Sequence, residues 1–148
     1  MKNTPEASKS ALWTGRVLSS LLVLFLALDG VMKLVKPAPV VEATTKLGYP
    51  ESSITGMGVT LLVCTALYAF RRTSILGAVL LTGYFGGAVA THVRAGAPVG
   101  QILFALFFGG LVWLGLYVRD AQLRATLPLR GGSAETVVSE PLAGTVAA

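Results

Sequence analysis

The sequence has 148 residues but only one cysteine, Cys64, and one histidine, His92. A single cysteine excludes an intrachain disulfide, and these two residues cannot supply a Cys/His metal cluster or bis-histidine haem ligation within one chain. We therefore expect no metal site and no catalytic centre of the metal-dependent kind. The sequence leaves open whether the chain has any enzymatic activity of its own.

Charge is also scarce. Charged residues make up 13% of the chain and hydrophobic residues 53%, and the mean hydropathy is +0.71. Soluble domains carry about 25% charged residues, so these values favour a membrane protein. The net charge is +5, but the basic residues lie at the ends of apolar runs, where they act as topology signals. The expected partner is therefore the lipid bilayer and not a nucleic acid.

Four apolar runs have the length of a membrane-spanning helix. They cover residues 12–35, 53–70, 74–93 and 99–118, and about 20 residues at 1.5 Å per residue cross a hydrocarbon core of roughly 30 Å. Pro37 and Pro39 end the first run, and residues 40–47 predict a short helix at the interface. The predicted fold is all-α: an integral membrane antiparallel four-helix bundle over residues 12–130, with an N-terminal tail (1–11) and a disordered C-terminal tail (131–148).

The basic residues also predict the orientation. Four spans place both termini on one side of the membrane. The terminal side carries eight of the twelve Lys and Arg residues, namely Lys2, Lys9, Arg16, Arg71, Arg72, Arg119, Arg124 and Arg130. The opposite side carries the other four, namely Lys33, Lys36, Lys46 and Arg94. The positive-inside rule then predicts a multi-pass protein of the cell's inner membrane with cytoplasmic termini.

Small residues recur at spacing four in the later spans and predict where helices pack closely. Gly56 begins such a series in the second span, Gly83 and Gly87 form a GxxxG in the third, and Gly109 follows Ala105 in the fourth. Without water in the bilayer core, helices associate through small residues of this kind. We therefore expect these four glycines at helix contacts.

The polar residues of the spans gather in the half of the bundle away from the termini. Asp29 lies roughly 10 Å below the outer edge, with Lys33 one turn above it, and Tyr84 lies at a similar depth. His92 and Gln101 lie at the edge itself. Charged residues at membrane depth are functional candidates, so these five residues predict a proton-handling pocket. Two plainer interpretations remain open: a structural Asp29–Lys33 ion pair and a hydrogen-bonded His92 anchor.

Three stretches resemble the DoxX-like family of small four-span membrane proteins. They are MKLVKPAPVVEATTKLGYP (32–50), LTGYFGGAVATHVR (81–94) and WLGLYVRDAQLRATLPLR (113–130). The resemblance implies a four-helix membrane bundle and a link to membrane oxidoreductase complexes, since the family takes its name from a subunit associated with thiosulfate:quinone oxidoreductase.

Together with the polar pocket, this resemblance predicts a non-catalytic accessory subunit of a quinone-linked redox system. It would hold a non-covalent quinone and work with a membrane oxidoreductase or as a homo-oligomer. The alternatives are a small-solute permease or exporter acting as an oligomer, and a structural membrane assembly factor.

Overall fold

The structure, a computed structural model, describes residues 9–120 and 123. Its helices are α1 (Lys9–Val35), α2 (Ala38–Lys46), α3 (Ser52–Ala69), α4 (Ser74–Arg94) and α5 (Val99–Arg119). The described part contains no strand, so the all-α fold class is confirmed. The predicted disordered tail at 131–148 lies outside the described residues, as do positions 1–8 of the N-terminal tail.

Four of the helices are long and apolar enough to cross a membrane. The qualifying segments are Trp13–Val35, Ser52–Ala69, Ser74–Arg94 and Val99–Arg119, with 18 to 23 residues each and a mean hydropathy of 1.5 to 2.0. The first helix begins at Lys9, three residues earlier than the sequence indicates, because no proline or glycine interrupts the approach to its apolar run. The chain is therefore a multi-pass membrane protein.

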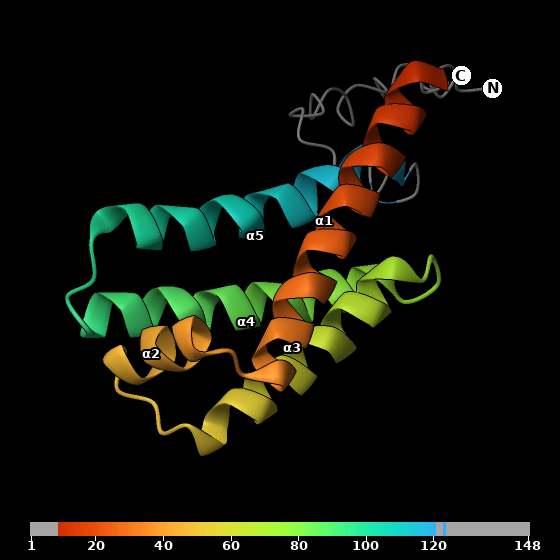
Figure 1. Ribbon diagram of the computed structural model, residues 1–148. Coiled ribbons are helices and arrows are strands. Elements are labelled where there is room, and N and C mark those ends of the chain that lie inside the picture. The colour runs from red at the N-terminus through yellow and green to blue at the C-terminus, as the bar shows by residue number, and fades with distance from the viewer. Residues whose placement is uncertain (1–8, 121–122, 124–148) are drawn as a thin grey trace, which may run out of the picture.

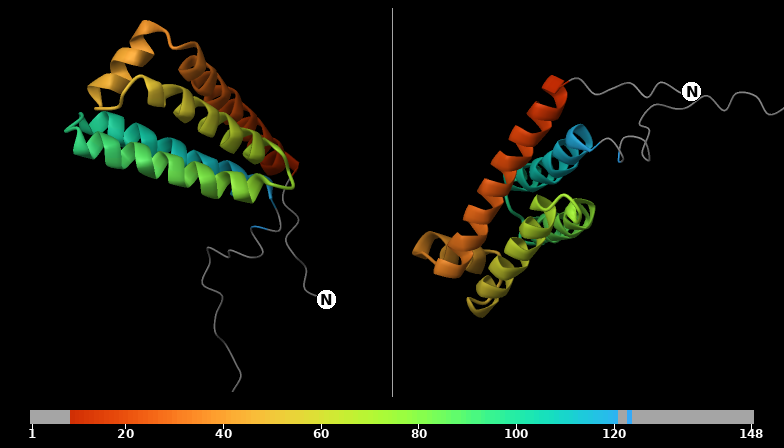
Figure 2. Two further views of the ribbon diagram at one scale, coloured as in Figure 1. Left: turned by 90° about the horizontal axis from the view of Figure 1, so that it is seen from below. Right: turned by 90° about the vertical axis from the view of Figure 1, so that its right-hand side faces the viewer.

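The four long helices form a closed ring of antiparallel neighbours. The helix α1 packs against α3 and α5, and α4 packs against the same two, so α1 and α4 lie on one diagonal. Figure 1 shows α4 and α5 running side by side while α1 crosses them at a steep angle. In Figure 2 the start of α1, the α3–α4 turn and the end of α5 lie together. We call this the terminal end of the bundle, and the opposite end, which carries α2, the α2 end.

Proline and glycine shape the connections at the α2 end. The extended backbone of Pro37 (φ −63°, ψ 150°) ends α1 and starts α2. Gly48 after α2 and Gly96 after α4 both have positive φ, 88° and 63°, which permits the tight reversals at these points. As a result α2 folds back toward the α4–α5 turn and does not extend away from the bundle.

Tyr68 on α3 is the central residue of the core at the terminal end. Its side chain is fully buried, and its hydroxyl donates to the Val112 carbonyl of α5 at 2.9 Å and lies 3.4 Å from the Ser19 hydroxyl of α1. The Arg119 guanidinium stacks 4.6 Å from the Tyr68 ring centroid and donates to its carbonyl at 2.9 Å. One side chain thus connects three helices, and the buried polar atoms are satisfied, which a low-dielectric interior demands.

The close helix contacts use glycines other than those predicted. A Cβ on Gly77 would collide with the backbone of Tyr68, and one on Gly115 would lie 2.8 Å from the Ser19 hydroxyl. Gly30 and Gly58 likewise let α1 and α3 approach, since a Cβ on Gly58 would lie 3.0 Å from the Gly30 carbonyl oxygen. At Gly30, Gly58 and Gly77 the neighbouring helix lies too close for a side chain, and at Gly115 the Ser19 and Tyr68 hydroxyls occupy the space that a Cβ would need.

The predicted packing glycines need a correction. A Cβ on Gly56, Gly83 or Gly87 would meet nothing within 4 Å, and one on Gly109 would make only ordinary contact with Phe85 at 3.9 Å. Within one chain, the prediction of close packing at Gly56, Gly83 and Gly87 is wrong. Their spacing correctly marks a single face of a helix, but that face points away from the bundle.

Candidate functional site

A groove of about 660 Å³ opens at the α2 end, between α2 and the α4–α5 turn. It exists because Pro37 turns α2 back over the bundle while Gly96 and Pro98 reverse the chain from α4 into α5. The lining residues come from three segments: Pro39, Glu42, Ala43, Lys46 and Leu47 of α2 and its end, His92 at the end of α4, and Ala95, Gly96, Ala97, Pro98 and Gln101 of the turn and the start of α5. Two of the five predicted pocket residues, His92 and Gln101, therefore line one groove.

The ring of His92 is held by its own helix. Its Nδ1 lies 2.7 Å from the Ala88 carbonyl oxygen. A carbonyl can only accept, so Nδ1 carries the hydrogen, and in the neutral ring Nε2 is then the nitrogen with a lone pair. The structure thus contains the hydrogen bond that the anchor interpretation of His92 predicts.

The remaining polar groups of the groove come from α2 and α5. Glu42 and Lys46 form an i,i+4 pair with 3.8 Å between Oε2 and Nζ, and their side chains are 69% and 78% exposed. Gln101 is exposed and adds an amide that can donate and accept. The groove therefore offers an imidazole, an amide, a carboxylate and an ammonium group at the membrane edge.

Asp29 and Lys33 form the predicted ion pair on α1, with 2.6 Å between Oδ2 and Nζ. The Lys33 side chain is 18% exposed and that of Asp29 40%. Neither residue lines the groove. The base of the Lys33 side chain lies instead against α3, where a Cβ on Gly58 would be 2.9 Å from the Lys33 Cβ. This contact places the pair at the α1–α3 crossing.

Tyr84 belongs to the interior as well. It is half-buried, packs on the hydrophobic core and meets the Phe85 ring edge-on, with ring centroids 6.1 Å apart. The structure thus divides the predicted pocket: His92 and Gln101 lie in the groove, Asp29 and Lys33 form an ion pair on α1, and Tyr84 packs against the hydrophobic core.

One further contact in this region was not predicted from the sequence. The hydroxyl groups of Tyr49 and Thr91 lie 2.7 Å apart and tie the loop before α3 to α4. The two residues are separated by 42 positions, so no local spacing could have identified the pair. Thr91 is 8% exposed, and this hydrogen bond holds α4 in place one residue before His92.

Comparison with known proteins gives one family match and no individual relative. The model of the DoxX-like family matches residues 17–115, which is more than half of the chain and includes every residue of the predicted pocket. No curated protein and no solved structure matches the chain.

Proposed function

The chain belongs to the DoxX-like family, and on this premise we propose that it is a non-catalytic accessory subunit of a quinone-linked membrane redox system. In this proposal the groove beneath α2 receives the head group of a quinone. The observation that supports the proposal is the groove itself, in which an imidazole and an amide line one opening at the membrane edge. A quinone supplies two-electron chemistry that takes up and releases protons, while the electrons come from an oxidoreductase partner.

The donor set of the groove suits such a head group. The Gln101 amide can donate a hydrogen bond to a quinone carbonyl. His92 donates its Nδ1 hydrogen bond to the Ala88 carbonyl. Its Nε2 can therefore accept a proton from the outer surface or return one to it. Glu42 and Lys46 remain largely exposed at the lip, where they set the local charge without closing the groove.

The packing of the core argues against the permease interpretation for a single bundle. Tyr68, Leu81, Val112 and Leu116 are each fully buried and fill the space between the helices at the terminal end. A solute path through one bundle would have to displace these side chains. The groove is therefore better suited to binding than to transport.

A titration tests the proposal. Purified protein in detergent would be titrated by calorimetry with a short-chain, water-soluble quinone analogue. We expect His92→Ala and Gln101→Ala each to weaken binding by about three- to tenfold, the usual contribution of one hydrogen bond. Thr45→Ala is the matched control, because Thr45 is exposed on α2 at a similar depth, bonds only its own helix and does not line the groove.

Asp29→Asn distinguishes the groove from the ion pair on α1. Asp29 does not line the groove, so this variant should bind the analogue like the wild type. No binding by the wild-type protein, or equal losses in Thr45→Ala and His92→Ala, would contradict the proposal. The assembly-factor interpretation would then be the better account.

A further inference from the structure

The two ends of the bundle differ in how their charged residues are paired. The three ion pairs of the described residues all lie at the α2 end: Lys33–Asp29 at 2.6 Å, Lys36–Glu51 at 3.9 Å and Lys46–Glu42 at 3.8 Å. Each acidic residue there thus has a basic partner. The α2 end is close to electrically balanced.

The terminal end has no such balance. Within residues 13–120 it carries Arg16, Arg71, Arg72 and Arg119 against one acidic residue, Asp120, whose Oδ1 already accepts from the Leu123 amide at 3.2 Å. Arg119 is half-buried on Tyr68, but Arg16, Arg71 and Arg72 are exposed. These three guanidinium groups are available to an anion from outside the chain.

The arginines come from different elements that meet at this end. Gly15, next to Arg16, lies against the backbone of Arg119, since a Cβ there would be 2.9 Å from the Arg119 nitrogen. Arg119 in turn reaches across to the Tyr68 carbonyl near the end of α3, three residues before Arg71. The basic residues of this end thus lie on the surface where α1, α5 and the α3–α4 turn meet.

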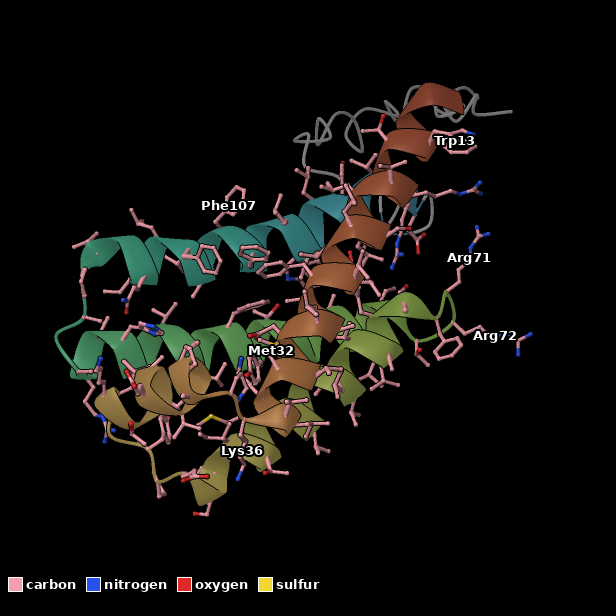
Figure 3. All side chains as sticks on the ribbon, in the orientation of Figure 1. Trp13, Met32, Lys36, Arg71, Arg72 and Phe107 are labelled. Atoms are coloured by element: carbon pink, nitrogen blue, oxygen red, sulfur yellow. The ribbon has the colours of Figure 1, made fainter. Side chains whose placement is uncertain are left out.

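Exposed aromatic residues flank this surface. Trp13 is 67% exposed and Phe70 is 68% exposed, and Figure 3 shows the Trp13, Arg71 and Arg72 side chains projecting from the same end of the bundle. Such aromatic rings settle at the level of lipid head groups. A shallow groove of about 410 Å³ starts at Trp13 and follows α1 through Val17 to Leu21, about 12 Å toward the bilayer centre.

We propose that Arg16, Arg71, Arg72 and Trp13 form a binding site for an anionic phospholipid of the surrounding bilayer. The phosphate lies among the guanidinium groups, which match phosphate oxygens in geometry as well as charge. An acyl chain lies in the groove along α1 below Trp13. The ion-paired α2 end lacks this excess charge, so the preference is confined to one leaflet. The inference does not depend on the quinone proposal.

The experiment compares phosphatidylglycerol with phosphatidylcholine. The full chain would be purified in detergent, supplied with each lipid, and examined by native mass spectrometry for bound lipid and by thermal unfolding. We expect more retained phosphatidylglycerol and a higher melting temperature with it than with phosphatidylcholine. At about 1 kcal/mol per arginine near an anionic surface, the variant Arg71→Gln/Arg72→Gln should retain phosphatidylglycerol at least tenfold more weakly.

The control is Lys36→Gln/Arg94→Gln, which removes the same two charges at the α2 end and should keep the preference. Unfolding in phosphatidylcholine checks that both variants fold. Raising the salt concentration should weaken phosphatidylglycerol binding to the wild type, because exposed charges are screened. This measurement requires no variant. Equal retention of the two lipids, equal losses in both double variants, or the same stabilisation by soluble glycerol phosphate would overturn the proposal.

Discussion

Tyr68 shows what a single residue contributes to this bundle and why sequence reasoning overlooked it. In the apolar run of α3 a tyrosine is typical of a membrane interface. Its hydroxyl instead reaches Val112 and Ser19, which are 44 and 49 positions away in the sequence. Only the crossing of α1, α3 and α5 brings these atoms together. The Asp29–Lys33 pair, in contrast, follows from spacing within one helix and was predictable.

The ion pair yields a prediction at the scale of residues. Asp29→Asn and Lys33→Met should each lower the melting temperature, because each leaves one charge without its partner at membrane depth. The double variant should be less destabilised than the sum of the two single variants, with a coupling free energy of about 1–3 kcal/mol. Thermal unfolding of the four proteins in the same detergent measures this coupling.

The coupling separates the two interpretations of the pair. A structural pair gives a clear coupling and leaves quinone binding unchanged in every variant. A coupling free energy near zero would show that Asp29 and Lys33 do not stabilise each other, despite the 2.6 Å between Oδ2 and Nζ.

At the scale of elements, two glycines of α4 give a matched test of helix packing. A Cβ on Gly77 would collide with the Tyr68 backbone, whereas one on Gly87 would meet nothing within 4 Å. Gly77→Ala should therefore force α3 and α4 apart and destabilise the protein by about 1–3 kcal/mol.

The same change at Gly87 should be neutral or stabilising by about 0.5–1 kcal/mol, because alanine favours the helix more than glycine does. Thermal unfolding of the two single variants compares them directly. Destabilisation by Gly87→Ala equal to that by Gly77→Ala would mean that the α4 face carrying Gly83 and Gly87 is covered by another molecule.

Gly77 and Gly87 also show the limit of prediction from the sequence. The long apolar runs and the prolines at 37 and 39 predicted the helices, because length and backbone chemistry are local. The face of each helix that points into the bundle was not predictable, because in a bilayer both the lipid-facing and the core-facing sides of a helix are apolar. Hydrophobic periodicity therefore does not identify the core-facing side of a membrane helix. A GxxxG motif identifies one face of the helix but not what packs against that face. The same limit explains why Tyr84 packs against the core while His92, eight positions later on α4, lines the groove.

At the scale of the whole molecule, the two proposed sites lie at opposite ends of a closed bundle. The groove with His92 and Gln101 lies at the α2 end, and the exposed arginines lie at the terminal end. The fully buried core around Tyr68, Leu81, Val112 and Leu116 separates them. Since the two ends face opposite sides of the membrane, the direction in which the chain is inserted decides which compartment would exchange protons with the groove if the proposed function holds.

The orientation is therefore the last prediction. The excess of basic residues at the terminal end predicts that this end faces the cytoplasm, where an anionic leaflet also suits Arg16, Arg71 and Arg72. A reporter enzyme that is active only outside the cytoplasm should be silent when fused after Ala148 or after Arg72. It should be active when fused after Gly96, in the turn beside the groove. Activity after Arg72 and Ala148 with silence after Gly96 would reverse the orientation, and the groove would then exchange protons with the cytoplasm.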